Sequence, residues 1–249
     1  MTQSNRICSL WIDGPLRLVD RVCLTSWVAN GMDVTLYTYG SVDNVPKGIA
    51  IADGATILPL ELADRMRSAR HPEADPPFIA FSDFFRIECQ RLGCGMWLDA
   101  DVLLFRPFTY DTGRVFLVRE NRFRLGYSTL YLPADNPMCT DYVRLRESSD
   151  LMPGWLGFKR RVLKPFVFRV AGIPWSPIDL GLTVYANDGF SRLARRYGYW
   201  SQTRSRETFY SWTGKRLYRM FEVVDYQPIL DNENCLGLHV HKKGDYILK

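Results

Sequence analysis

Two acidic residues, Asp99 and Asp101, stand one residue apart directly after the apolar run 93–98. A short apolar run that begins among glycines predicts a buried strand, with the two acids at its carboxyl end. Carboxylates in such surroundings need a positively charged partner, and a divalent cation with oxygen ligands is one. The pair therefore predicts a Mn²⁺ or Mg²⁺ site for a phosphate-bearing ligand. The plainer alternative is a turn with acidic caps.

The segment before this pair supplies a second set of charged residues. Residues 78–92 have helical periodicity, begin after two prolines and end at a glycine. Asp83 and Arg86 lie three residues apart, on one face of the predicted helix. They form either a solvated ion pair or an acid and a guanidinium that face a ligand beside Asp99 and Asp101.

These residues together resemble a known family. The sequence contains Ser82-Asp83-x-x-Arg86, Gly93-x-Gly95-x-Trp97-Leu98-Asp99-x-Asp101-Val102 and Arg106-Pro107-Phe108. This block resembles the sugar-binding region of D-x-D glycosyltransferases, the group of glycosyltransferase family 32, the α-1,4-galactosyltransferases and the glucosylating clostridial toxins. The resemblance implies a GT-A fold, a nucleotide-sugar donor, a manganese or magnesium ion, and transfer with retention of anomeric configuration.

The resemblance also implies roles for single residues. Asp101 would be the direct metal ligand, and Asp99 would contact ribose and sugar hydroxyls with a water-mediated route to the metal. Asp83 and Arg86 would hold hydroxyls of the donor sugar through charge-assisted hydrogen bonds. Trp11, in a segment that resembles the first strand of the family, would stack on the nucleotide base, unless it is a core residue.

The C-terminal segment 237–243 resembles the strand that closes the site in this family. His239 is the candidate for a metal or phosphate contact, and the alternative is a hydrogen-bonded core histidine. His241 would share its face because side chains alternate along a strand, so either histidine could serve. Lys242 and Lys243 would neutralise the diphosphate, or lie in a solvated tail.

The sequence indicates no single general base. Asp179 is the candidate that would face the acceptor, and Glu120 follows a predicted strand in the same region. In retaining enzymes of the resembled family the leaving phosphate can itself take the proton.

Composition fits one soluble α/β domain. The 249 residues are 47% hydrophobic, enough for a sizeable core. We expect a GT-A type, Rossmann-like doubly wound mixed sheet with a nucleotide-sugar-binding half (1–135) and an irregular, acceptor-facing half (136–249). Predicted strands cover 6–12, 33–39, 57–60, 93–98, 114–119 and 127–132, and predicted helices cover 18–29, 61–70, 78–92 and 137–147.

Other features bear on partners and compartment. Six cysteines without C-x-x-C spacing argue against structural zinc and favour a reducing cytoplasm. The first residues do not form a signal peptide, and we find no apolar run of transmembrane length. Residues 192–219 are rich in arginine and aromatic residues, which suits anionic lipid headgroups, nucleic acid or merely an exposed helix and loop. We expect no nucleic acid, because no nucleic-acid-binding signature accompanies the charge.

The most consistent hypothesis is a hexosyltransferase that acts on a saccharide or lipid-linked acceptor in bacterial surface polysaccharide or glycolipid synthesis, with peripheral contact at the inner membrane face. A non-catalytic nucleotide-sugar-binding domain on the same fold is an alternative. A haloacid-dehalogenase-like phosphatase is another, although its acid pair normally lies near the N-terminus.

Overall fold

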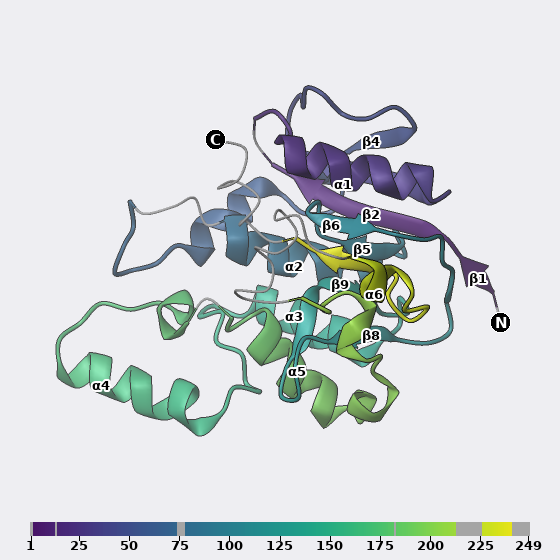
Figure 1. Cartoon of the computed structure of the whole chain (residues 1–249). Helices are drawn as coiled ribbons and strands as arrows, with labels where there is room; N and C mark the ends of the chain where they lie inside the picture. The colour runs from purple at the N-terminus through teal and green to yellow at the C-terminus, as the bar shows by residue number, and fades with distance from the viewer. Residues whose placement is uncertain (1, 13, 74–77, 182, 213–225, 241–249) are drawn as a thin grey trace.

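The computed structural model describes residues 2–12, 14–73, 78–181, 183–212 and 226–240. Its centre is a six-stranded sheet in the order β4-β3-β2-β5-β9-β8 (Figure 1). The strands are β4 (Ile49–Asp53), β3 (Asp33–Thr38), β2 (Arg6–Trp11), β5 (Met96–Leu98), β9 (Leu125–Tyr131) and β8 (Phe116–Arg119). The first four are parallel, β9 runs antiparallel to them, and β8 pairs antiparallel with β9 and so runs in the direction of the first four. This is the doubly wound mixed sheet predicted for a GT-A type fold.

Helices surround this sheet, and two small strand pairs accompany it. The helices are α1 (Leu18–Ala29), α2 (Phe78–Arg91), α3 (Pro137–Glu147), α4 (Lys164–Val170), α5 (Asn187–Arg196) and α6 (Gln227–Leu230). Strand β1 (Gln3–Ser4) pairs with β7 (Tyr110–Asp111), and β10 (Gly237–His239) pairs with β6 (Val102–Leu104). None of the described helices is long and apolar enough to cross a lipid bilayer.

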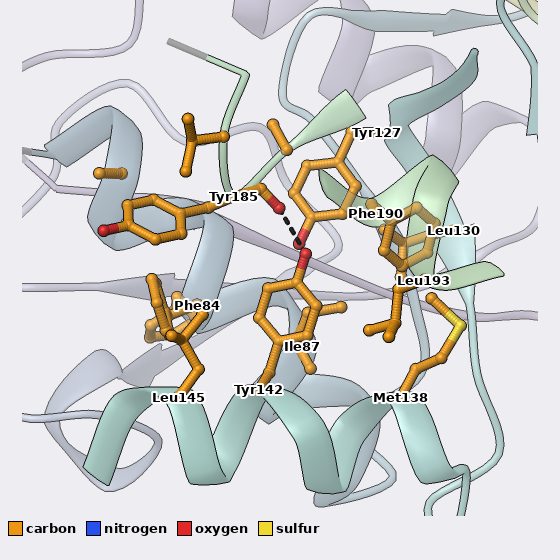
Figure 2. Packing of buried hydrophobic residues seen from close by; sticks show 14 of the residues in the cluster. Phe84, Ile87, Tyr127, Leu130, Met138, Tyr142, Leu145, Tyr185, Phe190 and Leu193 are labelled. Atoms are coloured by element: carbon orange, nitrogen blue, oxygen red, sulfur yellow. Dashed lines mark hydrogen bonds between the residues drawn. The ribbon is translucent and has the colours of Figure 1, made fainter. Parts of the chain in front are cut away.

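Two apolar clusters hold these layers together. In one, α3 packs Tyr142 against Phe84 of α2 and Tyr185, with the Tyr142 hydroxyl donating to the Tyr185 carbonyl oxygen (Figure 2). The other contains Trp27 of α1 and Val102 of β6, and the Trp27 indole N–H donates to the Val102 carbonyl oxygen at 2.6 Å. This second contact fixes β6, and with it the turn that carries Asp99 and Asp101.

One predicted strand is wrong. Residues 57–60 form no strand; the strand in this region is β4, and Leu60 begins the 3₁₀ helix Leu60–Met66 that replaces most of the predicted helix 61–70. Because β4 is an edge strand with three of its five side chains exposed, its alternation of small and apolar residues gives a weak sequence signal. The apolar Ile57 and Leu58 instead pack against the core from a loop.

Candidate active site

Asp99 and Asp101 lie in the tight turn between β5 and β6. The backbone N–H of Val102 donates to the Asp99 carbonyl oxygen at 3.0 Å, which closes the turn, and the Asp99 N–H donates to Ser128 in β9. The acidic-turn interpretation is therefore correct as local structure. However, both carboxylates line one cavity, so the turn also presents them to a ligand.

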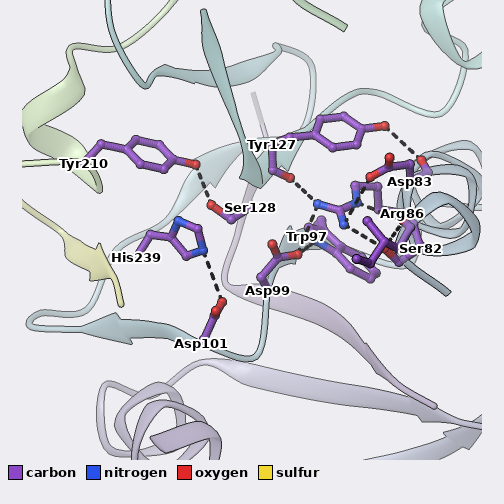
Figure 3. Close-up of polar contacts among 11 residues, drawn as sticks. Ser82, Asp83, Arg86, Trp97, Asp99, Asp101, Tyr127, Ser128, Tyr210 and His239 are labelled. Atoms are coloured by element: carbon purple, nitrogen blue, oxygen red, sulfur yellow. Dashed lines mark hydrogen bonds and ion pairs between the residues drawn. The ribbon is translucent and has the colours of Figure 1, made fainter. Parts of the chain in front are cut away.

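The chain brings His239 to this turn from far along the sequence. Strand β10 pairs with β6 so that His239 lies opposite Val102, and the Val240 N–H donates to the Asp101 carbonyl oxygen at 2.9 Å. The His239 Nε2 atom is 3.3 Å from Asp101 Oδ1 (Figure 3). One potential ligand atom from each of Asp99, Asp101 and His239 lies within 4.8 Å of the others, so the three residues could hold a metal ion.

The charge of this cluster affects His239. Burial lowers the pKa of the imidazole, but the charge and hydrogen bond of Asp101 outweigh it, and the pKa of His239 ends above its ordinary value. The ring of Tyr210 stands edge-on to the imidazole at 5.9 Å. The Tyr210 hydroxyl shares a 2.6 Å hydrogen bond with Ser128. Gly126 makes this approach possible, since a Cβ there would lie 2.0 Å from the Tyr210 ring.

Two buried residues of the predicted motif, Trp97 and Arg86, contact the carboxylate of Asp99. The Trp97 indole N–H donates to Asp99 Oδ1 at 2.7 Å, and Arg86 Nη1 lies 3.1 Å from the same oxygen. Arg86 also donates to the backbone oxygens of Ser82 and Tyr127, and it lies between the rings of Trp97 and Tyr127. Its donors are thus largely used within the protein, including one on the carboxylate of Asp99.

Asp83 differs from Arg86 because one of its polar atoms has no hydrogen-bond partner in the described part of the chain. Its side chain is almost completely buried, its Oδ1 is 3.6 Å from Arg86, and its Oδ2 has no hydrogen-bond partner among the described residues. Burial, opposed by Arg86 and reinforced by the charge of Asp99, raises the pKa of Asp83 to about 7. Asp83 is among the residues that line the cavity, and because buried polar atoms are normally satisfied, its unpartnered oxygen suits a hydroxyl-bearing ligand.

The cavity has a volume of about 480 Å³ and extends from the acidic turn to the end of β2. There Trp11 is half-buried and donates its indole N–H to the Gly14 carbonyl oxygen at 2.8 Å. Arg17 lies 5.9 Å from the Trp11 ring and forms a 2.6 Å ion pair with buried Asp20. The cavity thus has a flat aromatic surface at one end and the carboxylate–imidazole cluster further in.

Glu120 and Asn187 form another part of the cavity wall. The Asn187 side-chain amide donates to a Glu120 carboxylate oxygen at 3.2 Å and to the Leu125 carbonyl oxygen at 3.0 Å. Both residues line the cavity, whereas Asp179 is not among its lining residues. The Asp179 carboxylate instead accepts hydrogen bonds from Ser68, Ala69 and Ser176, which lowers its pKa against the effect of burial. The structure thus places Asp179 at the cap of a short 3₁₀ helix.

Three predicted site residues cannot be placed, and four residues that line the cavity were not predicted. His241, Lys242 and Lys243 lie outside the described residues, so their roles stay predictions. Arg17, Asp20, Ser128 and Tyr210 line the cavity although no motif marks them. The sequence offers one signal for Asp20, an acid on the otherwise apolar side of the predicted helix 18–29; it offers none for Ser128 or Tyr210.

Comparisons with known proteins find matches among solved structures alone. No protein-family model matches the chain, and no curated protein matches its sequence. Five chains among solved structures match its fold. One of them, "PaToxG Glycosyltransferase", is 12% identical over 80% of this chain and 72% of its own, with a TM-score of 0.49.

Proposed function

We propose that this protein is a metal-dependent glycosyltransferase that moves a hexose from a nucleotide-diphospho-sugar, with UDP as the nucleotide, to an acceptor hydroxyl with retention. The observation that carries the proposal is the cluster of Asp99, Asp101 and His239 in one cavity with the unpartnered oxygen of Asp83. The three-residue cluster would hold a metal ion, and the buried Asp83 oxygen beside it would accept a hydrogen bond from a hydroxyl group. This pair of features suits a ligand that joins a diphosphate to a sugar.

The chemistry of these three side chains fits the ion. Carboxylates are the hard oxygen ligands that Mg²⁺ and Mn²⁺ take, and an imidazole shifts the preference towards Mn²⁺. Asp101, His239 and Asp99 would hold the ion. When bound, it would neutralise the negative charge that develops on a diphosphate leaving group.

The protein's own residues would orient the donor. Trp11 offers its flat face to a base, and Asp83 Oδ2 accepts a hydrogen bond from a sugar hydroxyl. Arg86 and Trp97 hold Asp99 in one position before the donor arrives, which lowers the barrier by fixing geometry in advance. This assigns Arg86 to positioning rather than to direct sugar contact, because its donors are engaged.

The acceptor would approach along the wall of Glu120 and Asn187. Their mutual hydrogen bond orients the Glu120 carboxylate at the cavity, where it can receive or polarise an acceptor hydroxyl. We propose this role for Glu120 in place of Asp179, whose carboxylate is occupied in capping. A saccharide or lipid-linked acceptor remains part of the proposal.

Two rival functions make different use of the same cavity. A non-catalytic binding domain would bind the donor but leave it intact. A haloacid-dehalogenase-like phosphatase needs a lysine near its acid pair, and the described residues that line this cavity include none.

One experiment separates the three. Thermal stability is measured against a panel of nucleotide-sugars with and without Mn²⁺, and turnover is then followed as release of nucleoside diphosphate. We expect one donor to raise the melting temperature only with the metal, since a ligand stabilises the state that binds it. Slow metal-dependent donor hydrolysis should accompany it. Stabilisation without any turnover across acceptors would favour the binding domain, and hydrolysis of phosphomonoesters would favour the phosphatase.

A further inference from the structure

The segment between Asp150 and Asp179 contains no acidic residue. It carries five cations, Lys159, Arg160, Arg161, Lys164 and Arg169. The formal net charge of the whole chain is also +5, so the remainder of the protein is neutral on balance. The segment is thus one of two strongly positive stretches of the chain, the other being the arginine-rich range 192–219.

The same segment exposes an apolar surface. The π-helical turn η3 (Lys159–Leu163) continues into α4, which lies at the edge of the molecule, away from the sheet (Figure 1). Pro165 and Phe168 are the buried residues of α4. The exposed apolar side chains of this region are Phe158, Val162, Leu163, Phe166, Val167 and Val170, and those of Phe158 and Val170 are more than 70% exposed. These six residues define the apolar face.

Some of these five cationic side chains contact other protein groups, and others are exposed to solvent. Lys164 donates to the carbonyl oxygens of Asp179 and Leu180, and Arg160 pairs with Asp188 at 3.0 Å. Lys159 and Arg169 are exposed. Anchored cations therefore attach the helix to the body of the protein, while exposed cations accompany the apolar face.

A further exposed aromatic residue, outside this helix, lies near it. The hairpin tip between β8 and β9 carries Phe123, 62% exposed, between two arginines. The tip lines one groove and residues 157–160 line another, and both grooves include Asp188 and Arg192. The hairpin tip and the helix thus flank the same two residues of α5.

We propose that the apolar face, together with the Phe123 tip, binds the surface of a bilayer that contains anionic lipids. Large apolar side chains next to Lys and Arg are the pattern of an interfacial helix, in which the apolar side enters the headgroup boundary and the cations contact lipid phosphates. A contiguous exposed apolar surface on a soluble domain marks an interaction site. We place the main membrane contact on the apolar face and not on the range 192–219, of which residues 213–219 lie outside the described residues. In that range Arg206 donates to the backbone of Tyr210 and Ser211, and Arg204 stacks on Phe116.

Charge distinguishes a bilayer from other occupants. A second copy of the chain would bring the same five cations against this face, and like charges repel. A nucleic acid would use the cations but would gain nothing from exposed valine and leucine side chains.

The position of this surface suits the proposed reaction. Glu120 and Asn187 line the catalytic cavity, and the residues that follow each of them, Asn121 and Asp188, line the groove beside the apolar face. An acceptor held in a membrane would therefore reach the cavity on its acceptor side. Membrane binding itself does not depend on the proposed function, because it needs neither donor nor turnover.

The test is sedimentation of the full chain, without metal or donor, with vesicles of phosphatidylcholine and increasing phosphatidylglycerol. We expect binding that rises with the anionic fraction and falls with salt. Phe166→Ser with Val170→Ser should weaken it at least tenfold. Lys159→Glu with Arg169→Glu should weaken it further, since each cation contributes about fivefold near an anionic surface.

Matched controls exchange equally exposed residues elsewhere. Ile51→Ser with Val22→Ser, and Arg114→Glu with Arg144→Glu, should leave vesicle binding unchanged. Melting curves establish that every variant is folded. The proposal is overturned if the protein does not bind anionic vesicles or if the face variants bind them as well as the controls do. It is also overturned if the only effect of the face variants is to convert a dimer of the protein into monomers. Donor turnover with a water-soluble acceptor should survive the face variants, so failure here would leave the proposed function standing.

Discussion

Buried Arg86 and half-buried Asp99 form an ion pair in which Arg86 Nη1 lies 3.1 Å from Asp99 Oδ1. The Trp97 indole N–H donates to the same oxygen. Both contacts fall on Oδ1. The position of the Asp99 carboxylate is therefore set by contacts from α2 and β5.

Removing a carboxylate of the proposed metal site should abolish turnover. Asp101→Asn retains the shape of the side chain but loses the charge that attracts a divalent cation. We expect loss of metal-dependent donor turnover and little change in melting temperature. Asp64→Asn, at an exposed ion pair with Arg67, is the control and should behave like the wild type. Unchanged turnover in Asp101→Asn would refute the metal site.

The indole donor of Trp97 should matter more than its ring. Trp97→Phe retains most of the buried aromatic surface but removes the hydrogen bond to Asp99, and such supporting contacts are typically worth tenfold or more in activity or metal affinity. Trp155→Phe is the matched control, because the buried Trp155 N–H has no acceptor among the described residues. We expect about a tenfold loss of kcat/KM in Trp97→Phe alone; equal losses in both would show that only packing matters.

Asp83 should make the stability of the protein depend on pH. Burial raises its pKa from 3.8 to about 7 in the folded state. As pH rises, Asp83 therefore loses its proton in the unfolded chain before it does so in the folded protein. The contribution of Asp83 to the free energy of unfolding is fully present below about pH 4 and is lost as pH rises to about 7. Relative to the wild type, Asp83→Asn should gain stability over this window, on the order of 4 kcal/mol at most.

Denaturant unfolding of the metal-free protein at several pH values measures this gain. Asp64→Asn again serves as the control. A constant difference between Asp83→Asn and the wild type across the window would contradict the raised pKa.

Removing Arg86 should destabilise the fold, because Asp83 and Asp99 would lose their shared cation. Truncation of one partner of a buried ion pair typically costs about 3–5 kcal/mol. We expect Arg86→Ala to show a loss of this size in denaturant unfolding. The double variant with Asp83→Asn should recover part of it, and strict additivity of the two changes would argue against the coupling.

Trp11 should contribute to the affinity for the nucleotide itself. Trp11→Ala removes the aromatic surface at the end of β2, so calorimetry should show weaker binding of UDP in the presence of Mn²⁺. Base–aromatic stacking is worth about 1–3 kcal/mol per base, or roughly five- to a hundredfold. Trp200→Ala, outside the cavity lining, is the control. Equal UDP affinity in Trp11→Ala would assign Trp11 to the core.

The sequence by itself determined the local parts of this site. The apolar run before Asp99 and the periodicity of the segment with Asp83 and Arg86 are short-range signals, so strand, turn and helix follow from neighbouring residues. The order of the six strands and the strand at 49–53 could not be predicted from the sequence in the same way. A strand at the exposed edge of a sheet has only a weak alternation of apolar and polar residues.

Only the tertiary structure decided which distant residues meet at the acidic turn. His239 reaches Asp101 because β10 pairs with β6 in one register. Tyr210 reaches Ser128 because Gly126 leaves room for its ring. The structure also distinguishes Arg86, whose donors are engaged, from Asp83, whose Oδ2 has no hydrogen-bond partner among the described residues. These outcomes depend on long-range backbone pairing and on the packing of side chains, which no local spacing encodes.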